Sequence, residues 1–360
     1  MDPFYRLRRY LFSTKLSDKG LPFAEGLFLL MRLQFRKRSP AHAGRSVSEL
    51  VSRIIPVIWT MKKKYFNNFV IIGLGMVGTA IGFLLKKAGY KIIAIADNSP
   101  AALRRACPYT GGEAFRKPQE AAQEADCILI TTPDDAISSA CKEIALCPAI
   151  KDKFVFHMSG AGGLDLLEPA KKAGAAVASI HPLQSFSSID QAIQNIPGSY
   201  FGITADKKAE MLAKNIVRDV GGFPLLISAA QKPLYHAAAC FASNYLVSLM
   251  SVVESIYQAI GLTEKEAKKA YLPLVYGSLK NIERSGSITA LTGPIARGDF
   301  GTVRKHIAAI SNNLPQYASL YSSLGLLTVK IAQQKGSLNT RQAKKINDLL
   351  KGVVNNEQSK

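Results

Sequence analysis

Residues 69–97 constrain the fold of this chain more than any other stretch. Residues 69–72 are an uninterrupted run of Phe, Val and Ile, which is typical of a strand buried on both faces of a sheet. A glycine-rich turn follows, and then an apolar-periodic run that Gly89 closes, which predicts a helix. A second apolar strand at residues 92–96 ends in Asp97. This order predicts a strand–helix–strand unit with a sharp turn after the first strand.

The turn has the pattern G-x-G-x-x-G, which is made by Gly73, Leu74, Gly75, Met76, Val77 and Gly78. The first glycine permits the tight turn, the second lets a pyrophosphate approach the backbone, and the third lets the helix pack closely on the strand. Unpaired N–H groups at the helix N-terminus favour phosphate. Asp97, nineteen residues after Gly78, lies where a carboxylate accepts the hydroxyls of an adenosine ribose. Together these features predict a dinucleotide site; the alternative is a glycine-rich turn without a ligand.

The alternation of strands and helices continues to about residue 228. Further strands are predicted over residues 125–131, 154–157, 176–180, 200–204 and 224–228. Loops at the carboxyl ends of such strands line the ligand crevice of a doubly wound sheet. We therefore expect Thr131, Thr132 and Pro133, which follow one strand, to lie along the dinucleotide.

From residue 229 on, the pattern predicts helices only. Their expected bounds are residues 231–260, 263–284, 302–311, 315–334 and 340–350. Thr263 and Glu266 form a T-x-x-E capping box at the second of these. The fold class is therefore α/β: a Rossmann-type doubly wound, mostly parallel sheet followed by an all-helical second domain. The expected parts are a basic N-terminal extension at 1–64, a dinucleotide-binding domain at 65–228, a helical substrate and dimerisation domain at 229–352, and a polar tail at 353–360.

Charge and cysteine content narrow the class of protein. Half of the net charge of +20 lies in residues 1–64, which hold fourteen Lys and Arg against four Asp and Glu. The body of the chain is thus only mildly basic, and we expect no nucleic-acid partner; a nucleic-acid-binding protein is an alternative that rests on net charge alone. The five cysteines have no C-x-x-C spacing, so we expect neither a disulfide framework nor a metal site, and a reducing, cytoplasmic location.

Two segments raise the question of a membrane or a targeting signal. Residues 237–253 are apolar but contain three serines and an asparagine, and they are short for a membrane span, so we expect a buried helix and no membrane partner. The Arg-rich, acid-poor extension is compatible with a transit peptide or with an amphipathic segment on a membrane surface. Because Met61 stands just before the first strand, we favour an upstream segment outside the fold.

Several segments resemble a known group of enzymes. They are GLGMVGTAI, TTPDDAI, FHMSGA, HPLQSF, KPLYHAAACFASNY and LTGPIARGD, spread from Gly73 to Asp299. The chain resembles the superfamily of 6-phosphogluconate dehydrogenase, pyrroline-5-carboxylate reductase and prephenate dehydrogenase. More closely, it is similar to the Rossmann-like oxidoreductases whose helical half is catalogued as a domain of unknown function of the 2520 type. The resemblance implies the fold and a nicotinamide cofactor, and it does not supply a substrate.

The resemblance also implies roles for four residues. Prephenate dehydrogenases carry a catalytic His in an HP motif after a strand, with a Ser from the preceding strand end nearby; His181 and Ser159 match these positions. The substrate-binding arginines of that family are not recognisable, so prephenate itself is not expected. The β-hydroxyacid dehydrogenases carry a Lys and an Asn on the first helix after the Rossmann half. Lys232 matches the Lys, whereas His236 stands where the Asn is expected.

Helical spacing supports the second pair independently. Lys232 and His236 are four residues apart and face the same way, although a solvated lysine and a core histidine would show the same spacing. Asn244 lies near the same stripe, and Arg297 is suited to binding an anionic group bidentately; we expect both to bind substrate. In the alternative interpretation, Arg297 forms an ion pair with Asp299 and has no role in binding. His42, His157 and His306 belong to no recognisable constellation.

These observations predict an NAD(P)-dependent oxidoreductase. It would transfer a hydride between a nicotinamide cofactor and a small, anionic carbonyl/hydroxy or imine/amine substrate bound between the two domains. Lys232 or His236 would donate the proton while His181 orients the substrate. Asp97 favours NAD(H), since its charge repels a 2′-phosphate; NADP(H) is possible through Arg104 and Arg105. The helical domain would form a homodimer. The alternative function is a non-catalytic dinucleotide-binding sensor or scaffold.

Overall fold

The computed structural model describes residues 67–358, and the expected extension at residues 1–64 lies outside this range. Eight strands form one sheet in the order β3-β2-β1-β4-β5-β6-β7-β8. The strands are β1 Asn68–Ile72, β2 Lys91–Ala96, β3 Glu113–Phe115, β4 Cys127–Ile130, β5 Phe154–His157, β6 Ala176–Pro182, β7 Tyr200–Ala205 and β8 Phe223–Leu226. Strand β6 pairs with β7 in the antiparallel sense, whereas β1–β4, β4–β5, β5–β6 and β7–β8 are parallel. The predicted mostly parallel α/β sheet is confirmed.

The strand order reverses beside β1, in the middle of the sheet. Strand β1 lies between β2 and β4, so the strand order reverses at β1, and the carboxyl ends of β1 and β4 open onto the crevice that ligands use in such sheets. The glycine-rich turn follows β1, and Thr131 follows β4. Strand β3 was missed by the sequence analysis, because its three residues are all at least partly exposed and form no apolar run.

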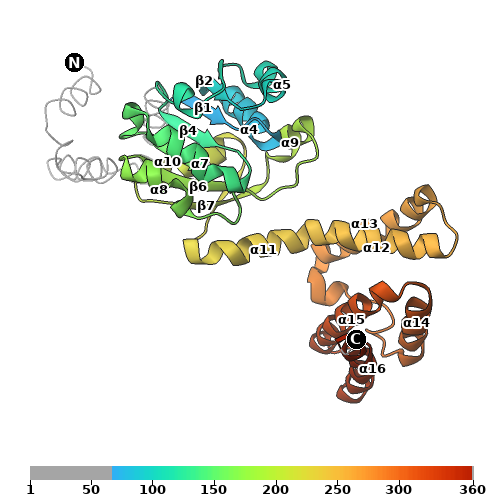
Figure 1. Ribbon diagram of the computed structural model, residues 1–360. Coiled ribbons are helices and arrows are strands. Elements are labelled where there is room, and N and C mark those ends of the chain that lie inside the picture. The colour runs from blue at the N-terminus through green and yellow to red at the C-terminus, as the bar shows by residue number, and fades with distance from the viewer. Residues whose placement is uncertain (1–66, 359–360) are drawn as a thin grey trace, which may run out of the picture. The chain divides into compact units, whose positions relative to one another are not determined.

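Helices cover both faces of the sheet (Figure 1). They are α4 Met76–Lys87, α5 Pro100–Thr110, α6 Pro118–Ala121, α7 Asp134–Ala145, α8 Glu168–Lys172, α9 Ile189–Asn195 and α10 Glu210–Asp219. Successive residues of a strand point to opposite faces. In β1, Phe69 and Ile71 join one core cluster with residues of α4, α5, α9 and α10, and Val70 and Ile72 join another with residues of α6, α7 and α8. Both faces of β1 are therefore buried, as its apolar run predicts.

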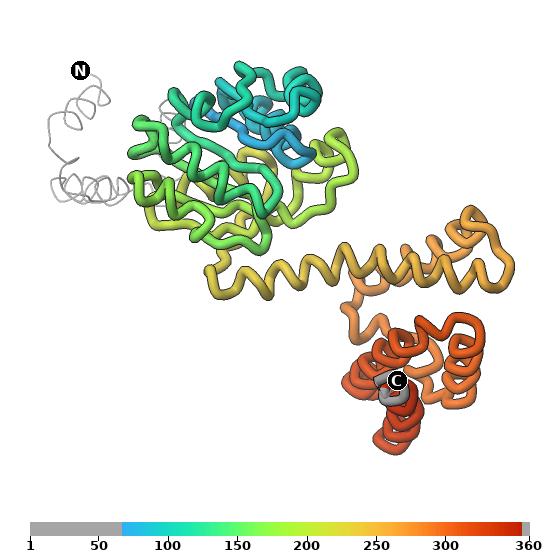
Figure 2. The backbone as a smooth tube through the Cα atoms, in the orientation of Figure 1, coloured from blue at the N-terminus to red at the C-terminus, as the bar shows by residue number. Residues whose placement is uncertain are grey.

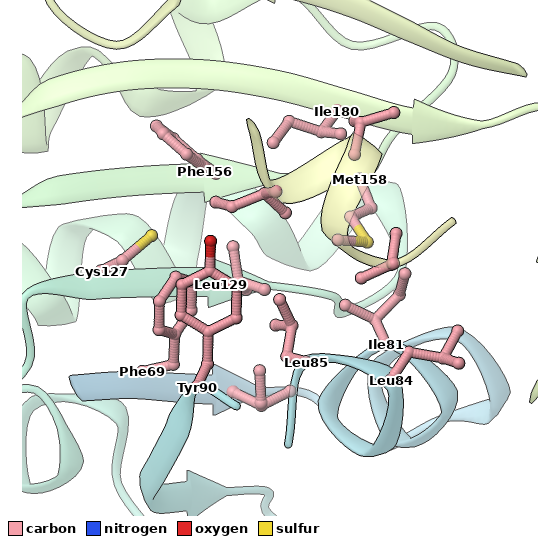
Figure 3. Packing of buried hydrophobic residues seen from close by; sticks show 14 of the residues in the cluster. Phe69, Ile81, Leu84, Leu85, Tyr90, Cys127, Leu129, Phe156, Met158 and Ile180 are labelled. Carbon is pink, nitrogen blue, oxygen red and sulfur yellow. The ribbon is translucent and has the colours of Figure 1, made fainter. Parts of the chain in front are cut away.

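The first of these clusters is seen in Figure 3, where side chains of α4 meet those of the central strands. The rings of Phe69 and Tyr90 lie edge to face, with centroids 4.7 Å apart, and Tyr90 donates a hydrogen bond to Asp219 across 2.6 Å. Each large apolar side chain that is fully buried contributes about 1.5–3 kcal/mol to the free energy of unfolding. This core holds α4 against β1 and β4. It thereby also holds the glycine-rich turn of residues 73–78, the predicted phosphate turn.

The chain continues as helices after β8. They are α11 Lys232–Ala242, α12 Asn244–Ala259, α13 Glu264–Ala290, α14 Phe300–Asn313, α15 Ala318–Lys335 and α16 Thr340–Gln358. The predicted capping box of Thr263 and Glu266 is confirmed at the start of α13. Apolar residues of α14, α15 and α16 form a small core of their own around Val303, Val329 and Leu350.

The predicted helix over residues 231–260 is two helices. They follow each other along one line (Figure 2) and are separated by Ser243, whose φ of −117° and ψ of −70° depart from the helical values. The backbone N–H of Ser243 still bonds the carbonyl oxygen of Ala239, as the C-cap of α11.

The expected burial of residues 237–253 is wrong for the single chain. The segment Ala229–Ala259 is long and apolar enough to cross a membrane by length and composition. Its 18-residue apolar window has a mean hydropathy of 1.3, and none of that window is buried within the chain. Phe241 and Val247 are 70% and 69% exposed. The apolar content of a helix shows that the helix needs a cover, but it does not say which molecule provides it.

Candidate functional site

The glycine-rich turn is shaped by the loop after β4. Gly73 has φ +89°, and a Cβ there would lie 2.6 Å from the amide nitrogen of Thr132. A Cβ on Gly78 would collide with the carbonyl oxygen of Gly73 and with Oγ1 of Thr131. A Cβ on Gly75, by contrast, would meet nothing within 4 Å. Gly73 and Gly78 therefore permit close packing. Gly75 faces the open space that a pyrophosphate requires.

Three further observations fit a dinucleotide at this turn. Helix α4 begins after Gly75 without a side-chain cap, so its first N–H groups are free for phosphate. The hydroxyl oxygen of Thr132 is buried without a partner among the described residues. Thr131 has another task, because its hydroxyl donates to the carbonyl oxygen of Gly73 across 2.5 Å and so fixes the turn. Pro133 precedes the first turn of α7 as its N-cap residue.

Asp97 binds the same turn from β2. Its Oδ2 accepts the N–H of Leu74 at 2.7 Å, and its Oδ1 accepts the N–H of Ser99 at 2.8 Å. Each carboxylate oxygen has a second lone pair, so Asp97 can still accept a ribose hydroxyl. Arg105 donates to the carbonyl oxygen of Leu74 across 3.0 Å, which brings a guanidinium to the same corner.

The register of the next strands assembles a second cluster. His157, the last residue of β5, is the partner of Ile130 in β4 and of Ser179 in β6. Ser159 and His181 each follow two residues after this row. Because β4, β5 and β6 are parallel, these polar side chains gather at the same carboxyl edge as the phosphate turn.

Lys232, the first residue of α11, enters this cluster with a side chain that is only 2% exposed. Its Nζ donates to the carbonyl oxygen of Ser159 at 3.0 Å and to Oγ of Ser179 at 2.8 Å. Burial lowers the pKa of Lys232 to about 8, an effect that the carboxylate of Asp134 partly opposes. The ammonium therefore joins α11 to two strands and remains able to exchange a proton near neutral pH.

Ser159 and His157 are held within the turn after β5. The hydroxyl of Ser159 donates to Asp134 across 2.6 Å and accepts the N–H of Gly162 at 2.7 Å. The Nδ1 of His157 accepts the N–H of Ser159 at 3.1 Å, so its Nε2 carries the proton and donates to the carbonyl oxygen of Gly163 at 3.0 Å. Burial lowers the pKa of His157 to about 4, with the Lys232 charge acting in the same direction. Ser159 thus acts on the shape of this turn.

His181 and His236 meet over Gly160. Their ring centroids are 5.8 Å apart at 77°. A Cβ on Gly160 would collide with Cδ2 of His236 and lie 2.8 Å from Nε2 of His181, so both rings need a glycine there. The other side of His181 contacts Tyr235, whose hydroxyl lies 3.0 Å from Nδ1. Burial lowers the pKa of His181 to about 4, and the Lys232 charge lowers it further, so the ring is neutral at pH 7.

The four predicted catalytic residues thus come together, whereas the two predicted substrate ligands do not join them. Among residues 67–358, no hydrogen bond or ion pair links the side chain of Asn244 or Arg297 to the cluster, and both residues are exposed. Asp299 caps α14 through Thr302. The substrate roles of Asn244 and Arg297 stay predictions.

Sequence reasoning missed several members of the cluster. Tyr235 is three residues after Lys232, a helical spacing that places it on the same face and that was available as a signal. His157 and Ser179 carry no signal of their own, since their proximity depends on the pairing of β5 with β6. Asp134 follows β4, and its bond to Ser159, which follows β5, depends on the pairing of these two strands.

The chain was compared with known proteins. Residues 62–182 match the Rossmann-like domain, and residues 199–328 match the Domain of unknown function (DUF2520). No match to a curated protein was found.

Solved structures share the architecture. A protein from Thermotoga maritima is 26% identical, with a TM-score of 0.60, over 74% of this chain and 99% of that chain. A Bacteroides fragilis protein described as an NADP oxidoreductase is 19% identical, with a TM-score of 0.60, over 74% and 98% of the two chains. A reductive aminase from Aspergillus terreus, solved with NADPH and ethyl-5-oxohexanoate, is 15% identical, with a TM-score of 0.51, over 81% and 94%. These likenesses concern the fold.

The glycines of the turn give a matched pair of variants. Gly78→Ala should lower the free energy of unfolding by about 1–3 kcal/mol, because its Cβ collides with the Gly73 carbonyl. Gly75→Ala should leave the melting temperature nearly unchanged, since its Cβ meets open space, yet it should weaken dinucleotide binding. Thermal unfolding and isothermal titration measure the two effects. Equal affinity of Gly75→Ala and the parent would contradict a phosphate site at this turn.

The neutral histidines predict an acid-sensitive fold. Between pH 6.5 and about 4 the unfolded chain binds protons that folded His181 resists, so stability should fall as pH is lowered through this range. Removing this histidine, in His181→Gln, should reduce that loss by up to about 3 kcal/mol. The control is His306→Gln, which replaces an exposed histidine of α14. Denaturant unfolding at several pH values measures it, and identical pH slopes for His181→Gln and the parent would refute the expectation.

Proposed function

We propose that this chain, which combines a Rossmann-like domain with a DUF2520 domain, is an NAD(P)-dependent oxidoreductase. Its substrate would be a small carbonyl/hydroxy or imine/amine compound. One observation carries the proposal: the open phosphate turn and the buried Lys–His cluster lie at the carboxyl ends of adjacent strands of one sheet. A nicotinamide held beyond the pyrophosphate would therefore lie beside ionisable side chains.

A bound reduced nicotinamide would supply a hydride, with its two electrons, to the carbon of the reducible bond. The heteroatom of that bond then needs one proton, which a positioned side chain delivers. His236 is the donor that the geometry supports best, because its half-buried ring lies against Gly160 beside His181. Lys232 is already bonded to Ser159 and Ser179, so it holds the cluster in place.

The compared proteins support the class of reaction. The Bacteroides fragilis protein is described as an NADP oxidoreductase, and the Aspergillus terreus enzyme is a reductive aminase. The rival function, a dinucleotide sensor without turnover, requires no ionisable cluster next to the nicotinamide. The convergence of Lys232, His236 and His181 on one strand edge favours the enzyme.

Cofactor preference is the first test. A thermal-shift screen with NAD, NADH, NADP and NADPH should show stabilisation by at least one of them, and stabilisation by none would refute the proposal. We expect tighter binding of NADH than of NADPH, because the Asp97 carboxylate repels a 2′-phosphate. The names of two compared proteins favour NADP(H), so the two arguments oppose each other. Asp97→Asn should improve the affinity for NADPH relative to NADH by about tenfold; tenfold tighter binding of NADPH by the parent would overturn the NAD preference.

The proton donor is tested by kinetics once a substrate is found from a metabolite panel. His236→Ala should lower kcat by at least about tenfold, without changing the melting temperature or cofactor affinity, because a general acid contributes about 10²–10⁴-fold. Lys232→Met should lower kcat by a similar factor and also lower the melting temperature, since Ser159 and Ser179 lose their donor. His306→Ala is the control. If both variants turn over like the parent, the donor must be sought at His181.

We further propose that the apolar face of α11 and α12 binds a second copy of the chain. With about 100° per residue, Lys232 and His236 lie on one face of α11, and Leu234 and Phe241 lie on the opposite face, where they are 78% and 70% exposed. A membrane is disfavoured as the cover, because Lys232 fastens the first turn to a polar strand edge that would enter the bilayer with it.

The second copy is tested by sedimentation. The parent should be a dimer, and Phe241→Glu should dissociate it. Leu146→Glu, which replaces an equally exposed leucine at the end of α7, should remain dimeric. A monomeric parent that binds lipid vesicles would overturn the proposal in favour of a membrane surface.

A further inference from the structure

We propose that Tyr235 fixes His181 in the tautomer whose proton is on Nε2, and that the substrate group facing His181 is therefore a neutral hydrogen-bond acceptor, a carbonyl oxygen, rather than an iminium cation. The second part rests on the proposed oxidoreductase function. The first part concerns the protein alone and holds or fails without any substrate.

Tyr235 is wedged between His181 and the neighbouring strand. Gly202 of β7 is the strand partner of His181. A Cβ on Gly202 would lie 2.7 Å from Cζ and 2.8 Å from the hydroxyl oxygen of Tyr235. The phenol ring therefore occupies the space that the Cβ of any other residue at position 202 would need. The rings of Tyr235 and His181 are perpendicular, with centroids 5.6 Å apart. The hydroxyl is thus held against Nδ1 by packing on two sides.

The hydrogen bonds of this hydroxyl decide the tautomer. Among residues 67–358, Nδ1 of His181, 3.0 Å away, is the one side-chain acceptor that the Tyr235 hydroxyl meets, so the hydroxyl hydrogen is directed to Nδ1. With Nδ1 as acceptor, the neutral ring carries its proton on Nε2. The opposite tautomer would leave the hydroxyl hydrogen without this partner inside the fold, which is unfavourable for a polar group taken out of water. His157 on the adjacent strand has the same tautomer, since a backbone N–H binds its Nδ1.

The Nε2 edge of His181 faces Gly160 and the ring of His236, the proposed proton donor. Nε2 and Cε1 are the atoms of the His181 ring nearest to Gly160, and His236 approaches the same glycine. Within the described part of the chain, Nε2 has no hydrogen-bond partner, whereas Nδ1 is engaged by Tyr235. Its N–H is therefore available to an acceptor that lies beside His236.

Among the charges near His181, the Lys232 ammonium acts against a further cation more strongly than the Asp134 carboxylate acts in its favour. The Lys232 ammonium disfavours a positive charge on His181, and it would disfavour an iminium cation in the same way. The nearby carboxylate, Asp134, accepts the hydroxyl hydrogen of Ser159. An iminium N–H would thus face the Nε2–H donor of His181, whereas a carbonyl oxygen accepts from it.

Nitrogen NMR of the full chain, labelled with ¹⁵N-histidine and free of cofactor, tests the tautomer. The His181 resonances are assigned by their loss in His181→Gln. We expect an unprotonated Nδ1 and a protonated Nε2 in the parent at pH 7, and a loss of this preference in Tyr235→Phe. Tyr321→Phe, which removes the hydroxyl next to His306, is the matched control and should leave His181 unchanged. A protonated Nδ1 in the parent, or an unchanged tautomer in Tyr235→Phe, would overturn the proposal.

The same signal tests the substrate class. With the bound nicotinamide cofactor present in its oxidised form, cyclohexanone should perturb the Nε2 resonance of His181, and protonated 1-piperideine, a cyclic iminium of the same ring size, should not. Perturbation by the iminium, or by neither probe, would overturn the carbonyl assignment. Failure of the proposed function would be seen in a different measurement: no nicotinamide cofactor would raise the melting temperature of the protein.

Discussion

The buried ammonium of Lys232 is the interaction on which the second half of the site depends. It ties the first turn of α11 to the loop after β5 through Ser159 and to β6 through Ser179. A lysine with its side chain 2% exposed loses most of its hydration, so its bonds must be good for the fold to tolerate the charge. Burial keeps His157 and His181 neutral, and the Lys232 charge acts in the same direction.

Absent side chains set the geometry around this charge. Gly78 lets α4 approach the loop after β4, Gly160 admits two imidazole rings, and Gly202 admits the phenol of Tyr235. At each position a single methyl group would displace a functional atom. Precise contacts of this kind cannot be made by flexible polar side chains alone, since every immobilised side chain costs conformational entropy. The polar groups therefore sit on strand ends and on the first turn of a helix, where the backbone is already ordered.

The phosphate turn was predictable from the sequence because its parts are contiguous. Strand, glycines, helix and Asp97 lie within thirty residues, and each has a local requirement that a sequence pattern can reveal. The ionisable cluster was predictable only in part. Lys232 and His236 share a helical spacing, whereas the place of His157 depends on which strands pair. The role of Asn244 was inferred from its place near the stripe of Lys232 and His236, and the role of Arg297 from residue type, which does not fix a distance.

The apolar segment after β8 shows most clearly what the sequence alone does not predict. Hydrophobicity predicted burial for residues 237–253, and a single chain leaves them uncovered. The two faces of α11 are nevertheless coupled, because a helix is rigid across its width: whatever covers Leu234 and Phe241 also restrains Tyr235 and His236 on the other side. A second copy on the apolar face would thus reduce the entropy that the catalytic face must lose when substrate binds. Dimer formation and the proposed proton transfer would then both depend on the same two turns of α11.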